Sequence, residues 1–212
     1  MGKLLIIKTG ASGESIKKVY GDHDERIIKK AGLNREKVAV LPVYKGHRPY
    51  LPDNVSSVIV TGSPSMVTDR EPWSVETSDF IKEISHKNIP ILGICYGHQL
   101  LADTFGGEVG YHKLGKESGK VDIKLRGAAS LDPLLGSMPK SFKAYAFHEQ
   151  TVTKLPANAK VLAGNGFEKN HAVAYRDNVW GVQFHPEFNE NENENGESHG
   201  EMLLKRFVQI AG

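Results

Sequence analysis

The single cysteine of the sequence, Cys95, stands in a pattern that favours a nucleophile. Its surroundings are Gly93-Ile94-Cys95-Tyr96-Gly97, the G-x-nucleophile-x-G form in which a strand turns sharply into a helix. Such a turn exposes the nucleophile at the carboxyl end of a sheet, and the helix N-terminus that follows favours a thiolate. The alternative is an inert structural thiol, because free cysteines are often buried.

A thiol nucleophile needs a base and a group that orients the base. His185 directly follows the apolar run VWGVQF, and Glu187 can accept a hydrogen bond from its second ring nitrogen. His148 competes for the role of base, whereas His98, one helical turn after Cys95, need not point at the thiol. Surface or structural roles are expected for the other histidines: His23, His47, His86, His112, His171 and His199.

Attack of a thiolate on an amide creates an oxyanion, which backbone N–H groups must stabilise. The turn at Cys95 offers the amide of Tyr96. A second donor must come from another loop, and Thr61-Gly62-Ser63-Pro64 follows an apolar strand and contains a glycine. An ordinary turn is the alternative interpretation of that segment.

These residues must be positioned by strands and helices, and the first half of the chain alternates between the two. This alternation predicts an α/β fold with a largely parallel central sheet. Strands are expected over 4–8, 37–43, 55–61 and 90–94, and a helix over 73–86 with Val75, Phe80, Ile81 and Ile84 on one face. Another helix is expected to have Ser12 or Ser15 as its N-cap, an interruption at Gly21 and Gly32 as its C-cap. A third helix is expected to follow Cys95 directly and to stop at Gly106.

The second half predicts added, partly antiparallel strands with few helices between them. Short strand candidates cover 108–111, 119–125, 143–147, 160–163 and 172–176, and 179–184 is expected to return to the central sheet. A closing helix is expected over 197–210, and the acidic run at 189–195 is expected to be a solvated loop.

The composition favours one soluble, cytoplasmic domain over residues 1–212. Hydrophobic residues make up 39% and charged residues 25%, with a formal net charge of +2. Without a long basic block, neither a nucleic-acid nor a membrane-surface partner is expected. The apolar run at 4–7 is too short for a signal peptide, and no stretch of about 18 apolar residues suggests a membrane span.

Three blocks of the sequence together resemble the class I (triad-type) glutamine amidotransferase family. They are Gly62-Ser63-Pro64, the run from Gly93 to Gln99 and the run from Gly181 to Glu187, in the family's order and spacing. The resemblance is closest to the glutaminase portion of GMP synthase and to free-standing GMP-synthase-like amidotransferases. It implies a three-layer, flavodoxin-like fold.

The resemblance also implies a catalytic triad of Cys95, His185 and Glu187. It implies an oxyanion hole formed by the amides of Ser63 and Tyr96. Substrate contacts are implied for Gln99 and for the backbone near Phe147 and His148. One departure concerns the oxyanion loop, where the usual Gly-Gly-Pro is Gly62-Ser63-Pro64. A backbone donor survives this change only where the dihedral angles suit serine. Otherwise the hole forms in a different conformation or after a loop moves.

The activity implied by the resemblance is cleavage of the side-chain amide of glutamine through a γ-glutamyl thioester on Cys95. No Gly-rich phosphate loop is present, so the ammonia acceptor would lie on a separate synthetase polypeptide. A γ-glutamyl peptidase with the same triad is the second hypothesis, and a non-catalytic regulatory or binding protein is the third. A redox sensor or protease of a related fold is disfavoured, because its histidine often follows the cysteine directly, where Tyr96 stands. We expect glutamine or another γ-glutamyl compound as ligand, with no cofactor and no metal.

Overall fold

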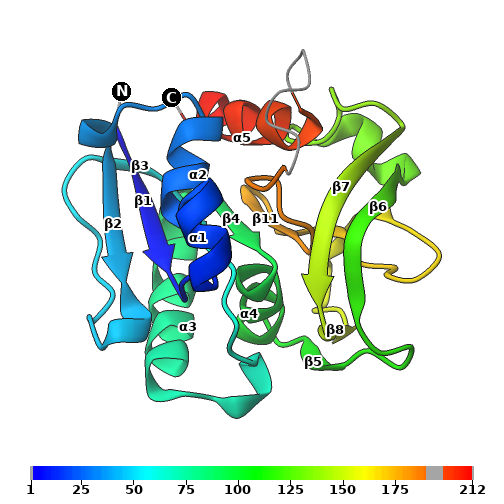
Figure 1. The fold of residues 1–212 in the computed structure, drawn as a ribbon, viewed down its shortest axis with the longest axis horizontal. Helices are drawn as coiled ribbons and strands as arrows, with labels where there is room; N and C mark the ends of the chain where they lie inside the picture. Colours follow the sequence, from blue (N-terminus) through cyan, green and yellow to red (C-terminus); the bar gives the residue numbers. More distant parts are fainter. Residues whose placement is uncertain (1, 190–197, 212) are drawn as a thin grey trace.

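The computed structural model describes residues 2–189 and 198–211, which form a nine-stranded sheet and a separate two-stranded sheet of β5 and β8. The strand order of the large sheet is β2-β1-β3-β4-β11-β10-β9-β6-β7 (Figure 1). The strands are β1 (Lys3–Lys8), β2 (Val38–Pro42), β3 (Val55–Val60), β4 (Ile91–Ile94), β5 (Glu108–Tyr111), β6 (Glu117–Leu125), β7 (Ser141–His148), β8 (Gln150–Lys154), β9 (Lys160–Gly164), β10 (Ala172–Arg176) and β11 (Val179–Val182). The α-helices are α1 (Glu14–Tyr20), α2 (His23–Lys30), α3 (Pro72–Ile84), α4 (Tyr96–Thr104) and α5 (His199–Ile210).

The large sheet changes from parallel to antiparallel pairing at β11. Strand β1 pairs in parallel with β2 and β3, β3 with β4, and β4 with β11. From β11 onward every pair is antiparallel, through β10, β9, β6 and β7. This arrangement confirms the predicted α/β fold with added antiparallel strands.

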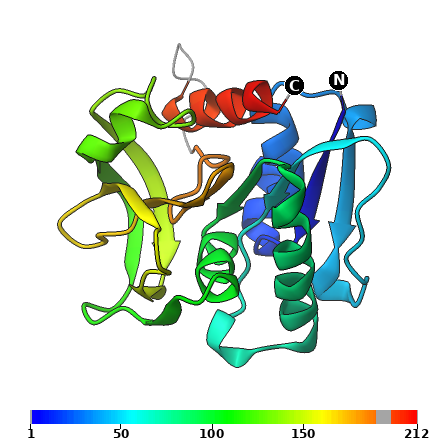
Figure 2. The ribbon, with the colours of Figure 1, turned by 180° about the vertical axis from the view of Figure 1, so that it is seen from behind.

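Helices cover both faces of the parallel part, as a parallel sheet requires. Along β1, Leu4 and Ile6 belong to one buried cluster, and Leu5 and Ile7 belong to another on the opposite face. Residues of α2 and α5 fill the first cluster, whereas residues of α3 and α4 fill the second. Both ribbon views place α5 beside α2 (Figures 1 and 2). The expected three-layer architecture is therefore confirmed.

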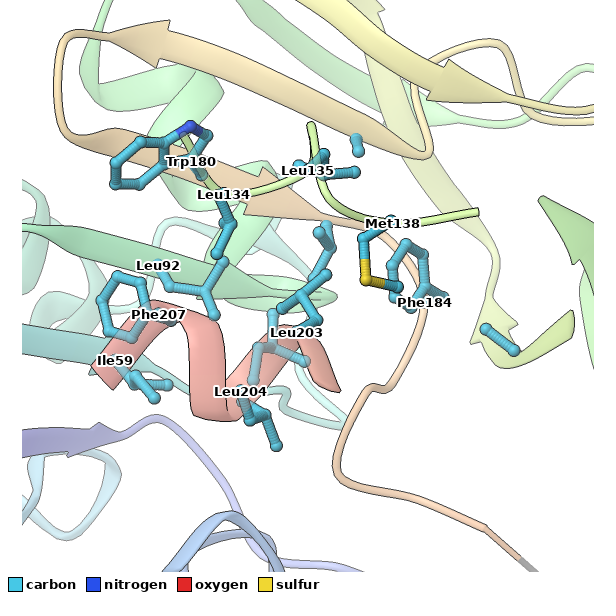
Figure 3. Close-up of a cluster of buried hydrophobic side chains, with 14 of the residues drawn as sticks. Ile59, Leu92, Leu134, Leu135, Met138, Trp180, Phe184, Leu203, Leu204 and Phe207 are labelled. Atoms are coloured by element: carbon cyan, nitrogen blue, oxygen red, sulfur yellow. The ribbon is translucent and has the colours of Figure 1, made fainter. Parts of the chain in front are cut away.

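The C-terminal helix supplies a dense apolar contact to the first cluster. Leu203, Leu204 and Phe207 of α5 have no measurable exposure. Figure 3 shows these side chains beside Ile59 of β3 and Leu92 of β4. Helix α5 thus packs against β4, the strand that ends directly before Cys95.

The helical segment before residue 32 differs from the expectation in its cap. Helix α1 follows Gly13 without a side-chain cap, so neither Ser12 nor Ser15 has the expected role. The break at Gly21 is confirmed, and α2 begins after Asp22, which forms a capping box with Glu25. Aspartate is a strong N-cap because its carboxylate accepts the first free N–H groups of the helix.

The buried face of α3 also differs from the expected one. Val75 is 37% exposed, and the buried positions are Ser74, Thr77, Ile81 and Ile84. Ser74 is buried because its hydroxyl lies 2.6 Å from the Tyr96 hydroxyl of α4. A polar contact between α3 and α4 therefore accompanies the buried face of α3, which the apolar pattern alone placed incorrectly.

Strand β8 is missing from the sequence-based expectation, because Gln150–Lys154 has only one aliphatic residue. It pairs with β5, so 108–111 forms a strand outside the large sheet. The acidic run at 189–195 lies outside the described residues except for Asn189. None of the helices formed by residues 2–189 and 198–211 is long and apolar enough to cross a bilayer.

Candidate active site

Cys95 occupies a strained turn between β4 and α4. Its backbone has φ 50° and ψ −99°, in a region that non-glycine residues rarely adopt. A Cβ on Gly93 would lie 2.5 Å from the carbonyl of Gly97, and a Cβ on Gly97 would collide with the carbonyl of Val60. Both flanking glycines are therefore required by packing, and the sequence prediction of a strand–turn–helix at Cys95 matches the backbone.

His185 and Glu187 follow β11, which is the parallel neighbour of β4. Carboxyl ends of adjacent parallel strands meet at one edge, so these side chains approach Cys95. The His185 amide donates to the Tyr145 carbonyl at 2.7 Å, which joins the turn to β7. Helix α5 closes over the turn, where Gly200 packs directly on the Pro186 backbone with no room for a Cβ.

The imidazole of His185 lies between Cys95 and Glu187. Its Nδ1 is 2.8 Å from Oε1 of Glu187. Burial lowers the pKa of His185, but the Glu187 carboxylate and the charge and hydrogen bond of Cys95 together raise it to about 10. Burial raises the pKa of Glu187, yet His185 and His23 bring it well below its usual value. The geometry thus favours an imidazolium beside a carboxylate.

The loop Gly62-Ser63-Pro64 lies against this constellation. A Cβ on Gly62 would be 2.9 Å from Cε1 of His185 and 3.7 Å from Cβ of Cys95. Ser63 is absent from the residues with positive φ, so its backbone conformation suits an L side chain. Its hydroxyl accepts a hydrogen bond from the Ser65 amide at 3.1 Å. The Gly-to-Ser departure is thus accommodated without strain.

The amides expected to form the oxyanion hole are those of Ser63 and Tyr96. Neither donates a hydrogen bond to another group within the part of the chain that the structure describes. The Tyr96 ring is fixed by its hydroxyl contact with Ser74, which anchors the first residue of α4. Both amides therefore remain available for a bound oxygen.

A cavity of about 250 Å³ extends from Cys95 along the C-terminal end of β7. Gln99 lines it, with Nε2 donating to the Gln150 carbonyl at 2.7 Å and to Oε1 of Gln183 at 3.0 Å. The carbonyl of Phe147 lies 3.7 Å from Sγ of Cys95. The structure therefore brings the predicted substrate-binding positions 99 and 147 together at the thiol.

His148 is also among the residues that line this cavity, but its ring makes hydrogen bonds with other groups. Its Nε2 is 3.0 Å from Oε2 of Glu117, and its Nδ1 is 2.9 Å from the Gln150 carbonyl. The competing role of His148 as the base is therefore not supported. His98 is also turned away, because its Nδ1 is 3.0 Å from the Tyr175 hydroxyl, and burial lowers its pKa to about 3.

His23 is the site residue that the sequence-based assignment missed. Its Nδ1 lies 3.0 Å from Oε1 of Glu187, and the rings of His23 and His185 stack at 5.9 Å. Arg26 lies one turn further along α2, with Nη2 3.7 Å from the same oxygen. The only sequence signal was a histidine directly after the helix-capping Gly21-Asp22 pair, which does not reveal a partner 164 positions away.

His23, His185 and Glu187 are the one group among the described residues whose ligand atoms are close enough to hold a metal ion. Their ligand atoms lie within 4.8 Å of one another. The guanidinium of Arg26 and the raised pKa of His185 both oppose a cation at this position. The charge pattern therefore fits proton handling better than metal binding.

A second cavity of about 190 Å³ opens on the other side of Cys95. His23, Arg26 and His185 line its polar wall. Ile16 and Phe188 contribute apolar surface, with further contributions from Ala11, Pro64 and Phe147. The thiol thus stands between two cavities of different character.

Comparisons with known proteins agree with this arrangement. Residues 19–207 match the family model described as glutamine amidotransferase class-I. The chain is 34% identical over 172 residues to a glutamine-hydrolyzing GMP synthase of Borreliella burgdorferi, covering 80% of this chain and 30% of that protein. It thus spans about a third of the length of the GMP synthases that it matches.

Shorter relatives are matched over most of their length. A separate subunit of the glutamine-hydrolyzing GMP synthase of Pyrococcus abyssi is 32% identical over 160 residues, which cover 75% of this chain and 77% of that subunit. Gamma-glutamyl peptidase 4 of Arabidopsis thaliana is 28% identical over 191 residues, which cover 88% and 76%.

The fold has a close counterpart among solved structures. A glutamine amidotransferase of Thermotoga maritima superposes with a TM-score of 0.78 at 21% identity, covering 100% of this chain and 98% of that one. The family match over residues 19–207 and the identity to the Pyrococcus protein lead to one conclusion. The chain belongs to the class I glutamine amidotransferase family.

Proposed function

We propose that the protein hydrolyses the side-chain amide of glutamine through a γ-glutamyl thioester on Cys95. The observation that carries the proposal is the junction of β4 and β11, where Cys95 meets His185 and Glu187 between two cavities. A thiol, a base and an orienting carboxylate in this order are the parts that nucleophilic acyl transfer needs.

In the first half-reaction the Cys95 thiolate adds to the amide carbon and forms a tetrahedral oxyanion. The free amides of Ser63 and Tyr96 are the donors proposed to bind that oxygen. The carbon–nitrogen bond then breaks as the His185 imidazolium gives its proton to the nitrogen. Ammonia leaves, and the γ-glutamyl thioester remains on Cys95.

In the second half-reaction neutral His185 takes a proton from water, whose oxygen attacks the thioester carbon. The carbon–sulfur bond breaks, and glutamate leaves with the thiolate and imidazolium restored. Glu187 keeps the imidazole in the tautomer with Nδ1 protonated and stabilises the imidazolium. Every proton in the cycle thus passes through Nε2 of His185.

The cavity at Gln99 is proposed to hold the γ-glutamyl group. Gln99 uses both amide hydrogens on protein acceptors, which leaves its carbonyl oxygen for a substrate donor. Lys116 and Glu149 line the same cavity and lie 3.7 Å apart, with side chains 57% and 45% exposed. Opposite charges side by side complement the ammonium and carboxylate of an α-amino acid. This charge pair supports a substrate with both α groups free.

The ammonia released is proposed to serve an acceptor on a separate synthetase polypeptide. The support is the similarity to the GMP synthase protein of Pyrococcus abyssi, which is itself one subunit of that enzyme, over 77% of its length. Soluble, cytoplasmic operation as one catalytic domain is part of the same proposal. Glutaminase activity of the purified chain is expected to rise when such a partner is supplied.

The second cavity favours a second candidate function, hydrolysis of γ-glutamyl amides whose leaving group is larger than ammonia. It adjoins Cys95 and His185 and measures about 190 Å³, with apolar walls that include Ile16 and Phe188. Ammonia alone does not require such space. The similarity to gamma-glutamyl peptidase 4 of Arabidopsis thaliana supports the same candidate.

One experiment tests the proposal and separates the two candidates. Glutamate release is measured from glutamine and from γ-glutamyl dipeptides for the wild type, Cys95→Ala, His185→Ala and a control, His47→Ala, whose side chain is exposed. We expect the first two variants to lose at least about 1,000-fold in kcat and the control to match the wild type. An active Cys95→Ala variant would sink the thioester mechanism. Turnover of dipeptides alone would reject the glutaminase in favour of the second candidate.

A further inference from the structure

One oxygen of Glu187 lies within hydrogen-bonding distance of two imidazole rings. Oε1 is 2.8 Å from Nδ1 of His185 and 3.0 Å from Nδ1 of His23. All three residues are at most 8% exposed. The rings of His23 and His185 are nearly parallel, with an interplanar angle of 24°. The orienting carboxylate therefore has two imidazole partners, from segments far apart in the chain.

The short distance to Glu187 decides which nitrogen of His23 carries a proton. A carboxylate has only acceptors, so an unprotonated Nδ1 at 3.0 Å would set two lone pairs against each other. The proton must therefore lie on Nδ1, which donates to Oε1. Arg26, whose Nη2 is 3.1 Å from the same Nδ1, then makes its hydrogen bonds with the Gly21 carbonyl and the Ser12 hydroxyl.

His23 is held in a frame that keeps it aimed at the carboxylate. It is the first residue of α2, and its amide donates to the side chain of Asp22. Asp22 also accepts from the Ser12 amide at 2.8 Å and from Nζ of Lys8 at 2.7 Å. Lys8 lies at the end of β1, so the frame connects the central sheet to the imidazole.

We propose that His23 is a positioning residue of the triad, whose Nδ1–H donates the second hydrogen bond to Oε1 of Glu187. This inference rests on the proposed function. The second donor fixes the carboxylate in the orientation that His185 needs. It also divides the negative charge of Glu187 between two imidazoles, so the charge acts less strongly on His185.

A consequence for proton transfer follows from this division of charge. The charged and titratable groups that face Glu187 among the described residues are His185, His23 and Arg26, and Cys95 faces His185 from the elbow. When the carboxylate interacts with one imidazolium alone, it stabilises the charged form of that ring more strongly. The imidazolium is then a weaker acid and gives its proton less readily to the leaving nitrogen. Removal of the His23 donor should therefore raise the pKa of His185 and slow amide cleavage.

The test compares His23→Phe, which has no donor, with His23→Asn, whose amide N–H can reach the same oxygen. For His23→Phe we expect kcat with glutamine to fall roughly ten-fold at pH 7 and the basic limb of its pH profile to move up by about one unit. We expect KM to change by less than about two-fold and His23→Asn to recover kcat to within about three-fold of the wild type. Equal losses in both variants, or a loss of kcat without movement of the basic limb, would overturn the proposal.

A substrate-independent measurement separates this inference from the proposed function. The pKa of His185 is followed by NMR titration in the wild type and both variants, with His185→Ala used for assignment. A higher pKa in His23→Phe than in the wild type and His23→Asn is expected. An unchanged pKa in a folded His23→Phe variant refutes the role of His23, even where hydrolysis is normal. A wild type that hydrolyses no γ-glutamyl compound rejects the proposed function, but the NMR result still decides the role of His23.

Discussion

At the scale of single residues, the two sides of Cys95 carry different charge patterns. The cavity toward Gln99 presents one cation and one anion, Lys116 and Glu149, at the adjoining ends of β6 and β7. The other cavity has a polar wall in which Arg26 lies with two histidines, His23 and His185, and it has no carboxylate in its lining. A zwitterionic head group is complementary to the first side only, which fixes the direction in which a γ-glutamyl substrate is expected to bind.

This direction yields a prediction about selectivity. Lys116→Met should raise KM for glutamine about five- to ten-fold and lower the preference for glutamine over its α-amide, which lacks the carboxylate. Glu149→Gln should instead lower the preference over N-acetylglutamine, which lacks the ammonium. Steady-state kinetics with the three substrates measure both effects, and Lys113→Met, at an exposed position outside the cavity, is the matched control. Equal loss of both preferences in both variants would contradict the assignment.

The sequence identifies some of these residues and not others for a physical reason. Cys95, His185 and Glu187 stand in short local patterns, because each lies in a turn that directly follows the end of a strand. His23 carries no such pattern, since its contact with Glu187 exists only once the first residue of α2 lies beside the turn that follows β11. Lys116 and Glu149 are likewise ordinary surface charges until β6 and β7 pair.

At the scale of elements, the elbow between β4 and α4 stores strain at Cys95, the proposed nucleophile. The φ of 50° at Cys95 carries a steric cost of roughly 1–3 kcal/mol for a residue with a Cβ, and glycine avoids most of it. Gly93 and Gly97 are not among the glycines with a positive φ, so neither carries that cost. The strain is therefore concentrated on Cys95.

A comparison of two inactive variants tests this strain. Cys95→Gly should unfold at a higher urea concentration than Cys95→Ala, by about 1 kcal/mol in the free energy of unfolding, despite the larger entropy of the unfolded glycine chain. Equilibrium urea unfolding measures the difference. A Cys95→Ala variant as stable as Cys95→Gly would show that the elbow is relaxed. The control is Gly127→Ala, at a position where a Cβ meets nothing within 4 Å. It measures how a glycine-to-alanine change alters the free energy of unfolding where there is no positive φ.

Elements were predictable from the sequence where one pattern dominated. Strands β1 and β4 and the second half of β3 are apolar runs because helices cover both of their faces, and such runs are easily recognised in a sequence. The cap of α1 and the buried face of α3 were misjudged: α1 follows Gly13 without a side-chain cap, and Ser74 is buried against Tyr96 of a distant helix. Strand β8 was missed because two of its buried residues, Gln150 and Thr151, are polar and are hydrogen-bonded, Thr151 to Glu168.

At the scale of the whole molecule, stability should depend on buried carboxylates. Burial raises the pKa of Glu117, but hydrogen bonds from His148, His171 and Asn165 bring it far below its usual value. A carboxyl with a lowered pKa stabilises the fold above its unfolded pKa, here 4.5, and that contribution is lost as the pH falls toward the folded value. Glu187 behaves in the same way.

The free energy of unfolding should therefore fall below pH 4.5, by roughly 1.4 kcal/mol per pH unit for each such carboxylate. Glu117→Gln should lower stability at pH 7, because two buried histidines lose their anionic partner, and should make the acid decline shallower by one such increment. Urea unfolding from pH 7 to pH 3 measures both. The control Glu83→Gln, at a surface position 69% exposed, should keep the wild-type slope of unfolding free energy against pH. A slope in Glu117→Gln as steep as that of the wild type would show that Glu117 does not contribute to the acid decline.

The position of β11 in the sheet has a consequence for the order in which the molecule is assembled. It comes last in sequence among the described strands, yet it lies between β4 and β10 in the middle of the sheet. A nascent chain therefore presents the Cys95 segment about 90 residues before His185, its proposed base, a delay of roughly 5–20 s at ordinary rates of translation. Throughout that interval the thiol lacks the strand that carries its proposed base, so on the proposed mechanism synthesis itself postpones catalytic competence until β11 has emerged.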